Sequence, residues 1–170
     1  MGKIEKRMIS PVTILRPIRA DDNAPLAAII RATLAAVGLD WPGTVHSDPS
    51  TDHLHELFQR RGSAYVVAER AGRVLGGVGI LHTDGLPPDT VELARVYLVP
   101  EARGQGLGRQ LVEQCLNAAA SYGYRRIYLE TVAEMVEALP LYEKLGFHYL
   151  TRPLGDTGHF SLDIWMLKEL

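Results

Sequence analysis

The stretch RGQGLG at residues 103–108 is the segment that best defines the fold of this chain. It follows an apolar pattern typical of a β-strand at residues 91–99, and it opens a helical pattern that continues to about residue 122. Three glycines at alternate positions remove side chains where the strand passes into the helix. The first N–H groups of a helix lack partners inside it and carry partial positive charge, so this loop is suited to bind a phosphate or pyrophosphate.

The glycine spacing argues against two common phosphate-binding motifs. A P-loop requires Lys and then Ser or Thr after its last glycine, and neither follows here. The dinucleotide fingerprint Gly-x-Gly-x-x-Gly needs its third glycine one position after Gly108. Glu130 does end the next strand pattern, where a ribose-binding acid would lie, so a nicotinamide-dependent oxidoreductase stays open as an alternative. A turn that only packs a helix on a sheet is another alternative.

Two longer segments carry a family resemblance. The first, ARVYLVPEARGQGLGRQLV at 94–112, contains Arg-x-x-Gly-x-Gly, and the second, IYLETVAEMVEALPLYEKLGFHYL at 127–150, contains LYEKLGF. In this order they resemble the pyrophosphate-binding motif and the second half of the GNAT superfamily of N-acetyltransferases. The resemblance is close over residues 90–150 and looser over 14–82. The final TGHFSLDIWMLKEL is similar to a subset of small single-domain members whose substrates are unassigned.

The length of 170 residues, with 46% hydrophobic and 22% charged residues, predicts one globular domain at 11–170 behind a flexible N-terminus at 1–10. The element order predicts one mixed α/β sheet, mostly antiparallel, with helices on both faces. In the GNAT fold that the resemblance implies, strands 91–99 and 126–131 run parallel and splay apart, and the acyl-CoA lies in the splay. The patterns further predict strands at 12–17, 64–69, 74–82, 147–150 and 161–167, and helices at 24–37, 51–61, 105–122 and 134–145.

The resemblance implies acetyl-CoA as the co-substrate and a primary amine as the acceptor. The N–H groups after Arg103 would bind the pyrophosphate, and the two arginines would add positive charge. The end of the preceding strand would pair with the pantetheine arm. The implied coenzyme-binding residues are Val96, Tyr97, Leu98, Arg103, Gly104, Gln105, Gly106, Leu107, Gly108 and Arg109.

Two residues are candidates for moving the protons that acetyl transfer requires. Tyr142 in LYEKLGF matches the tyrosine that many GNAT enzymes place beside the thioester sulfur, where a phenol would protonate the departing thiolate. Its alternative role is packing, because it shares a helix face with other apolar residues. Glu92 interrupts an apolar strand on the face expected for Leu98, and the resemblance places it at the position of a catalytic base. An ion pair with Arg95 is its alternative role, and Glu130 is a rival base.

Pro140 falls inside the predicted helix 134–145. Because proline lacks an N–H and clashes with the carbonyl four residues back, the helix either starts near Ala138 or bends at the proline. Both arrangements would affect where Tyr142 lies relative to the sulfur.

The acceptor is less defined by the sequence. Candidate substrate contacts are Trp41 and His46 in the 40–50 loop, Glu130, and His159 near the C-terminus. Loop histidines and tryptophans also serve as packing residues, so both roles stay open. Small size and the acidic pI favour a small-molecule amine over a protein. A non-catalytic module that binds or senses acyl-CoA is the alternative to an enzyme.

Composition restricts the remaining partners. A net charge of −2 and a pI near 6.3 argue against nucleic acid, and no apolar run predicts a signal peptide or a membrane span. The single cysteine, Cys115, lies on an apolar helix stripe, which fits packing in a reducing cytoplasm rather than a covalent acetyl-cysteine route. No metal-binding motif is present, so we expect no metal. An exposed strand at 162–167 could pair two copies into a homodimer.

Overall fold

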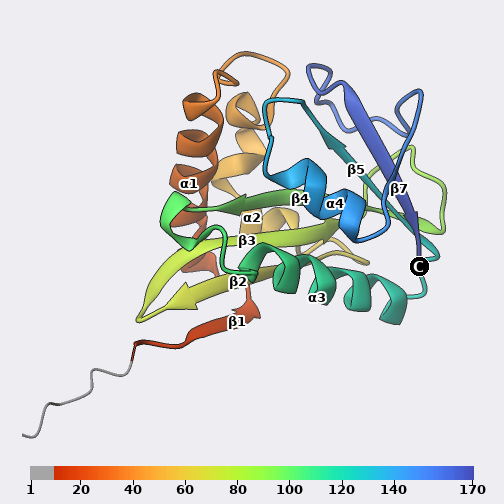
Figure 1. Cartoon of the computed structure of the whole chain (residues 1–170). Helices are drawn as coiled ribbons and strands as arrows, with labels where there is room; N and C mark the ends of the chain where they lie inside the picture. Colours follow the sequence, from red (N-terminus) through yellow and green to blue (C-terminus); the bar gives the residue numbers. More distant parts are fainter. Residues whose placement is uncertain (1–9) are drawn as a thin grey trace, which may run out of the picture.

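The computed structural model describes residues 10–170, so the predicted flexible N-terminus lies almost entirely outside the described part. Figure 1 shows the chain as a sheet with helices packed against it. The elements in chain order are β1 (Thr13–Pro17), η1 (Ala20–Asp22), α1 (Asn23–Ala36), η2 (Val45–Ser47), η3 (Pro49–Asp52), α2 (Leu54–Leu57), β2 (Ala64–Arg70), β3 (Arg73–Leu81), β4 (Thr90–Leu98), η4 (Pro100–Ala102), α3 (Leu107–Ser121), β5 (Arg126–Thr131), α4 (Ala138–Lys144), β6 (His148–Tyr149) and β7 (Ile164–Glu169).

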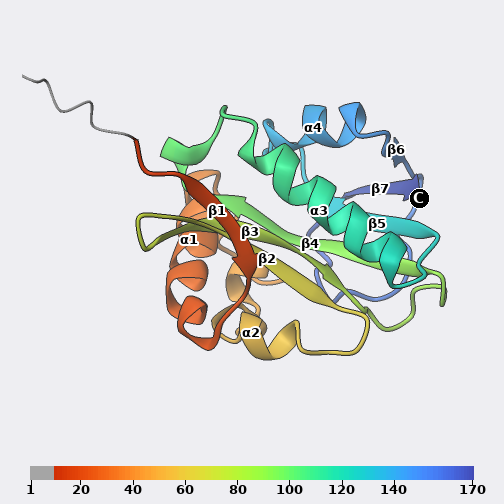
Figure 2. The same cartoon turned by 90° about the horizontal axis from the view of Figure 1, so that it is seen from below.

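The strands form one seven-stranded mixed sheet in the order β1-β2-β3-β4-β5-β7-β6. Only β4 and β5 pair in parallel, and every other neighbouring pair is antiparallel. Figure 2 shows α3 and α4 on one face and α1 and α2 on the other. The predicted mixed α/β sheet with helices on both faces is therefore confirmed, and its strand order is not that of a doubly wound dinucleotide-binding sheet.

The parallel pair separates soon after it forms. Pairing between β4 and β5 runs only from Thr90 opposite Arg126 to Glu92 opposite Tyr128. Beyond Glu92, β4 turns away while β5 continues along β7, and α4 lies beside the gap (Figure 1). The predicted splay is present, and it leaves one edge of β4 without a neighbouring strand.

A β-bulge in β4 lies next to the splay. The register between β3 and β4 shifts between Gly77 and Gly79, opposite Arg95, which has a φ of 57°. The Tyr65 hydroxyl donates a hydrogen bond of 2.9 Å to the carbonyl of Arg95. A Cβ at Gly77 would lie 2.4 Å from the Tyr65 ring, and one at Gly79 would lie 2.3 Å from the Phe58 ring. The glycines of β3 thus make room for the aromatic rings that support the bulge.

The bulge exchanges the faces of the second half of β4. Ala94 and Tyr97 pack in the cluster beneath α1, whereas Val96 and Leu98 pack against the cluster beneath α3. In a regular strand, residues 94 and 96 would share a face. Glu92 and Leu98 therefore do not lie on the same face, and the prediction that they do is wrong.

Three further expectations need correction. The predicted helix 51–61 is broken into η3 and the short α2, because His53 between them has a φ of −134°. The predicted helix 134–145 begins only at Ala138. This places Pro140 in the first turn, where its missing N–H has no partner to lose. The predicted exposed strand 162–167 is β7, which lies between β5 and β6 and so is not a free edge for a homodimer. Across residues 10–170, no helix has the length and apolar character needed to span a membrane.

The turn between β2 and β3 offers a stability test. Ala71 and Gly72 have φ values of 50° and 78°, the signs that a type I′ turn requires at both central positions. Because alanine is strained there and asparagine is not, we expect Ala71→Asn to raise the free energy of unfolding by about 0.5–1 kcal/mol. Gly72→Ala should lower it by a similar amount. Urea denaturation of both variants measures this, and an unchanged midpoint for Ala71→Asn would contradict the turn assignment.

Candidate active site

A cleft opens where β4 and β5 separate, and residues from both faces of the sheet line it. Leu34 comes from α1 on one face and Tyr142 from α4 on the other. Glu92, Tyr97 and Glu130 come from the two diverging strands. Because the strands part here, side chains that an unbroken sheet would separate reach the same space.

Tyr142 lies in α4, and its side chain is almost completely buried, with 4% of the residue exposed. Its ring packs against that of Phe147 at a centroid distance of 5.8 Å. Within residues 10–170 its hydroxyl has no hydrogen-bond partner, although the residue borders the cleft. Burial raises the pKa of Tyr142, so the phenol keeps its proton at neutral pH and is free to donate it. The predicted packing role is thus present, the residue also lines the cleft, and its role as general acid stays a prediction.

Glu92 ends the paired part of β4 and is 5% exposed. The Thr83 hydroxyl donates a hydrogen bond to its carboxylate. Arg95, the predicted ion-pair partner, binds Asp48 instead, at 3.0 Å. Burial raises the pKa of Glu92 above its ordinary value of 4.5, and the negative charge of Glu130 acts in the same direction. The result is a buried carboxyl group with increased proton affinity.

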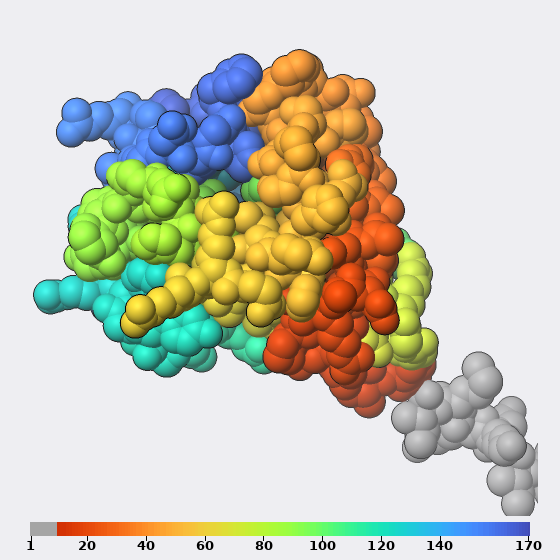
Figure 3. All heavy atoms as spheres, turned by 180° about the vertical axis from the view of Figure 1, so that it is seen from behind, coloured from red at the N-terminus to blue at the C-terminus, as the bar shows by residue number. Residues whose placement is uncertain are grey.

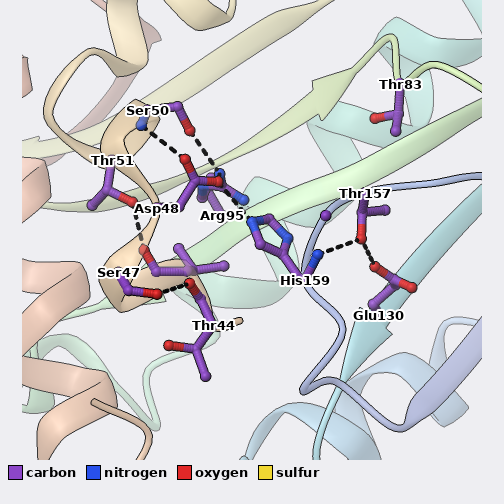
Figure 4. Close-up of polar contacts among 12 residues, drawn as sticks. Thr44, Ser47, Asp48, Ser50, Thr51, Thr83, Arg95, Glu130, Thr157 and His159 are labelled. Carbon is purple, nitrogen blue, oxygen red and sulfur yellow. Dashed lines mark hydrogen bonds and ion pairs between the residues drawn. The ribbon is translucent and has the colours of Figure 1, made fainter. Parts of the chain in front are cut away.

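Glu130 lies opposite, near the end of β5, and hydroxyl groups hold both of its carboxylate oxygens. The Tyr128 hydroxyl donates to one at 2.9 Å, and the Thr157 hydroxyl donates to the other. The backbone N–H of Leu154 donates to the Tyr128 oxygen at 3.1 Å, which ties the C-terminal segment to β5. These hydroxyl groups fix the orientation of Glu130, and Figure 4 shows the contact with Thr157.

Asp48 joins two loops that are far apart in the sequence. Its Oδ2 lies 2.7 Å from Nε2 of His159 and accepts a hydrogen bond of 3.0 Å from Nη2 of Arg95 (Figure 4). These contacts, with His159 contributing most and the backbone of Ser50 assisting, hold the pKa of Asp48 well below its usual range. Figure 3 shows the segment around residue 45 meeting the C-terminal segment, where the N–H of Ser161 also donates to the Gly43 carbonyl at 3.1 Å.

Glu92, Glu130 and His159 converge, with one side-chain donor atom from each lying within 4.8 Å of the others. These are ligand types that divalent metals use. Donors around an ion bound at about 2.1 Å lie about 3.4 Å apart in a tetrahedral site, so these three would have to move closer together to bind one. The sequence motifs that predicted no metal could not detect this cluster, because its members come from three separate segments.

Two of the predicted substrate contacts lie outside the cleft. Trp41 is 49% exposed and His46 contributes its backbone carbonyl to a contact with Arg31, and neither side chain borders the cleft. The roles of Asp48 and Thr157 as partners of cleft residues were not predicted. Asp48 in Asp-Pro-Ser resembles an ordinary helix cap, and it does accept the N–H of Ser50. Its second contact, with His159, could not be predicted from this local pattern.

The loop at 103–108 has the backbone geometry expected of an anion site. Gly104 and Gly106 have φ values of 69° and 77°, which favour glycine, and α3 begins at Leu107. Among residues 10–170, no protein acceptor binds the six consecutive N–H groups of residues 104–109. Gln105 holds the loop by donating to the Glu101 carbonyl at 2.8 Å. Six unpaired donors at a helix N-terminus form a site for a phosphate group.

The two arginines of this loop contact protein groups. Nε of Arg103 donates to the Leu98 carbonyl at 3.0 Å, which covers an acceptor at the end of β4. Nε of Arg109 donates to Glu113 at 2.9 Å, one helical turn along α3. In this structure, protein groups accept hydrogen bonds from both arginines.

Comparison with known proteins agrees with this geometry. The sequence profile of the acetyltransferase (GNAT) family matches residues 31–147. The Escherichia coli protein named "Uncharacterized N-acetyltransferase YjgM" is 39% identical over 158 residues, covering 92% of this chain and 95% of that protein. The chain therefore belongs to the GNAT family of acetyltransferases. It is an N-acetyltransferase, as predicted.

Solved structures show the same fold. A GNAT-family acetyltransferase from Staphylococcus aureus superposes with a TM-score of 0.79 at 14% identity, covering 93% of this chain and 99% of that chain. A phosphinothricin acetyltransferase from Sinorhizobium meliloti, solved in complex with AcCoA, superposes with a TM-score of 0.73 at 23% identity, covering 93% and 88%. The predicted GNAT fold is thus confirmed.

The raised pKa of Glu92 predicts a stability cost. A carboxyl group whose pKa is higher in the folded state than its unfolded value of 4.5 binds its proton more tightly when folded. Above pH 4.5 the wild-type protein therefore loses stability as pH rises through the folded pKa. Glu92→Gln cannot ionise and should be more thermally stable than wild type at pH 8, with the gain vanishing below pH 4.5. A destabilised Glu92→Gln at pH 8 would contradict this account.

Proposed function

We propose that this chain transfers an acetyl group from acetyl-CoA to a primary amine by direct attack. The observation that carries the proposal is the row of six unpaired N–H groups at residues 104–109, at the start of α3. The end of β4 leads from the splay cleft to this loop. A helix N-terminus with free donors suits the CoA pyrophosphate. The AcCoA complex of the Sinorhizobium meliloti relative supports this choice of co-substrate.

The free edge of β4 would receive the pantetheine arm. Backbone groups of Val96, Tyr97 and Leu98 lie beyond the last β4–β5 pair, so the arm can add to this edge as a strand would. Arg103 now covers the Leu98 carbonyl. When the arm binds, Arg103 would release that carbonyl, and its guanidinium would be available to the pyrophosphate.

The cleft residues would move the protons. The Glu92 carboxylate takes one proton from the acceptor ammonium, and the neutral amine forms a C–N bond to the thioester carbon. As the C–S bond of the adduct breaks, the Tyr142 hydroxyl protonates the departing sulfur. The second proton leaves the nitrogen and restores the phenol. The products are an amide, free CoA and one proton, which Glu92 returns to solvent.

Gly106 provides a test of the coenzyme site. Its left-handed backbone and the open space around it are shared by Gly123, at the end of α3, with φ values of 77° and 88°. We expect Gly106→Leu to weaken acetyl-CoA binding at least tenfold, because the side chain would cover the donor N–H groups. Gly123→Leu is the matched control, with similar backbone strain and wild-type affinity. Isothermal titration calorimetry measures both, and retained affinity in Gly106→Leu would rule out this loop as the phosphate site.

Replacement of Tyr142 tests the chemistry. We expect Tyr142→Phe to bind acetyl-CoA normally but to release CoA on the order of a hundredfold or more slowly with an active amine, since a general acid contributes rate factors of that size. Tyr149→Phe, which removes an exposed phenol on β6, is the control. Wild-type turnover in Tyr142→Phe would remove its role as acid. Tight acetyl-CoA binding with no CoA release for any amine would instead favour the acyl-CoA-binding module.

A further inference from the structure

The charges around the cleft are not balanced. Glu92 and Glu130 point into the same space, and within residues 10–170 neither has a Lys, Arg or His nitrogen within 4.0 Å. Their hydrogen-bond partners are hydroxyl groups, which bring no positive charge to the cleft. A buried carboxylate without a counterion is costly unless a cation binds beside it. The two carboxyl groups of the cleft therefore favour binding of a positively charged ligand.

The two basic side chains that line the cleft already bind another protein group. Arg95 and His159 both contact the single carboxylate of Asp48, at 3.0 and 2.7 Å. The Asp48 carboxylate balances the charge of Arg95, whose buried side chain borders the cleft. Asp48 thus pairs with the two cleft residues that would otherwise be available to bind a ligand carboxylate.

Several apolar side chains form another part of the cleft wall. Leu34 and Leu39 lie on the α1 side, Val45 lies in η2, and Met135 and Leu162 come from the segments before α4 and β7. These side chains can bury the hydrocarbon body of a ligand but offer it no hydrogen bonds.

We propose that the acceptor is a primary alkyl- or arylalkylamine with an apolar body and no carboxylate beside its amino group. This inference rests on the proposed function, which brings an amine to this cleft. The ammonium would lie between Glu92 and Glu130, and the hydrocarbon part would lie against the leucines. Glu130, whose two carboxylate oxygens are held by hydroxyl groups, would bind the ammonium while Glu92 accepts its proton. Each carboxylate therefore has a separate task.

The same geometry disfavours α-amino acids. Their carboxylate lies two bonds from the amino nitrogen and would enter the space between Glu92 and Glu130 as a third negative charge. Like charges at close range in a buried site repel strongly. Within residues 10–170, Arg95 and His159 are the basic side chains that line the cleft, and Asp48 contacts both of them. Asp48 would therefore be a specificity-determining residue that does not itself touch the amine.

Matched substrate pairs test the inference directly. 2-Phenylethylamine with phenylalanine, and 3-methylbutylamine with leucine, each differ only by the carboxylate. We expect kcat/KM from CoA release to be at least a hundredfold higher for each amine. Calorimetric binding to the protein with desulfo-CoA should show the same order without requiring turnover. Equal or better use of the amino acids would overturn the inference.

Two variants separate the roles. Glu130→Gln should raise KM for 2-phenylethylamine at least tenfold while leaving the affinity for acetyl-CoA unchanged. Asp48→Asn should free Arg95 from its ion pair. The ratio of kcat/KM for the amine to that for the matched amino acid should then fall at least tenfold. Glu130→Gln keeps the inference testable if Asp48→Asn fails to fold. An unchanged KM in Glu130→Gln would show that this carboxylate does not hold the ammonium.

The possible outcomes distinguish this inference from the proposed function. If amines bind in preference to amino acids but no CoA is released, the function fails and the ligand class stands. If CoA is released faster with amino acids, the function stands and the ligand class fails. Amine binding should also survive EDTA. Its loss on chelation, with recovery on adding Zn²⁺, would mean that a metal at Glu92, Glu130 and His159 supplies the positive charge, and would overturn the inference.

Discussion

The β-bulge at Arg95 is the constraint on which the site depends. It places one extra residue in β4 just after the last pair with β5, at the point where the strands separate. A bulge bends its strand and breaks the alternation of side chains. The bend accompanies the splay, and the broken alternation sends Val96 to one face and Tyr97 to the other. A regular β4 would leave less room for a ligand between the strands.

The support for this bulge is unusual in its composition. Arg95 adopts a positive φ that a residue with a Cβ rarely takes, and the hydroxyl of Tyr65 binds its carbonyl. Its Nε is buried and has no partner among residues 10–170. Backbone strain and an unpaired buried N–H both lower stability, and such features are typical of positions that serve function. Here the strain places the Arg95 side chain against Asp48, so the backbone irregularity and the charge arrangement of the cleft have one origin.

Local sequence motifs predicted the coenzyme side of the site, which is formed by backbone groups. The RGQGLG loop and the splayed strands depend on glycines and on free N–H groups, whose requirements can be read from spacing alone. Tyr142 and Glu92 both line the cleft, and their catalytic roles stay predictions. The prediction that Glu92 shares a face with Leu98 was wrong. A bulge needs a supporting hydroxyl from another strand, and the sequence of β4 alone contains no sign of it.

The acceptor half could not be predicted because contacts between distant segments build it. Asp48 and His159 are 111 positions apart, and their hydrogen bond exists only once both loops have folded over the cleft. Trp41 and His46 have the residue types of a binding loop, but neither lines the cleft. Charge pairing decides which residues of these loops face a ligand. Asp48 forms an ion pair with Arg95, so Arg95 does not form one with Glu92 or Glu130. A substitution at Asp48 should therefore change the choice of acceptor more than a substitution at any exposed loop residue.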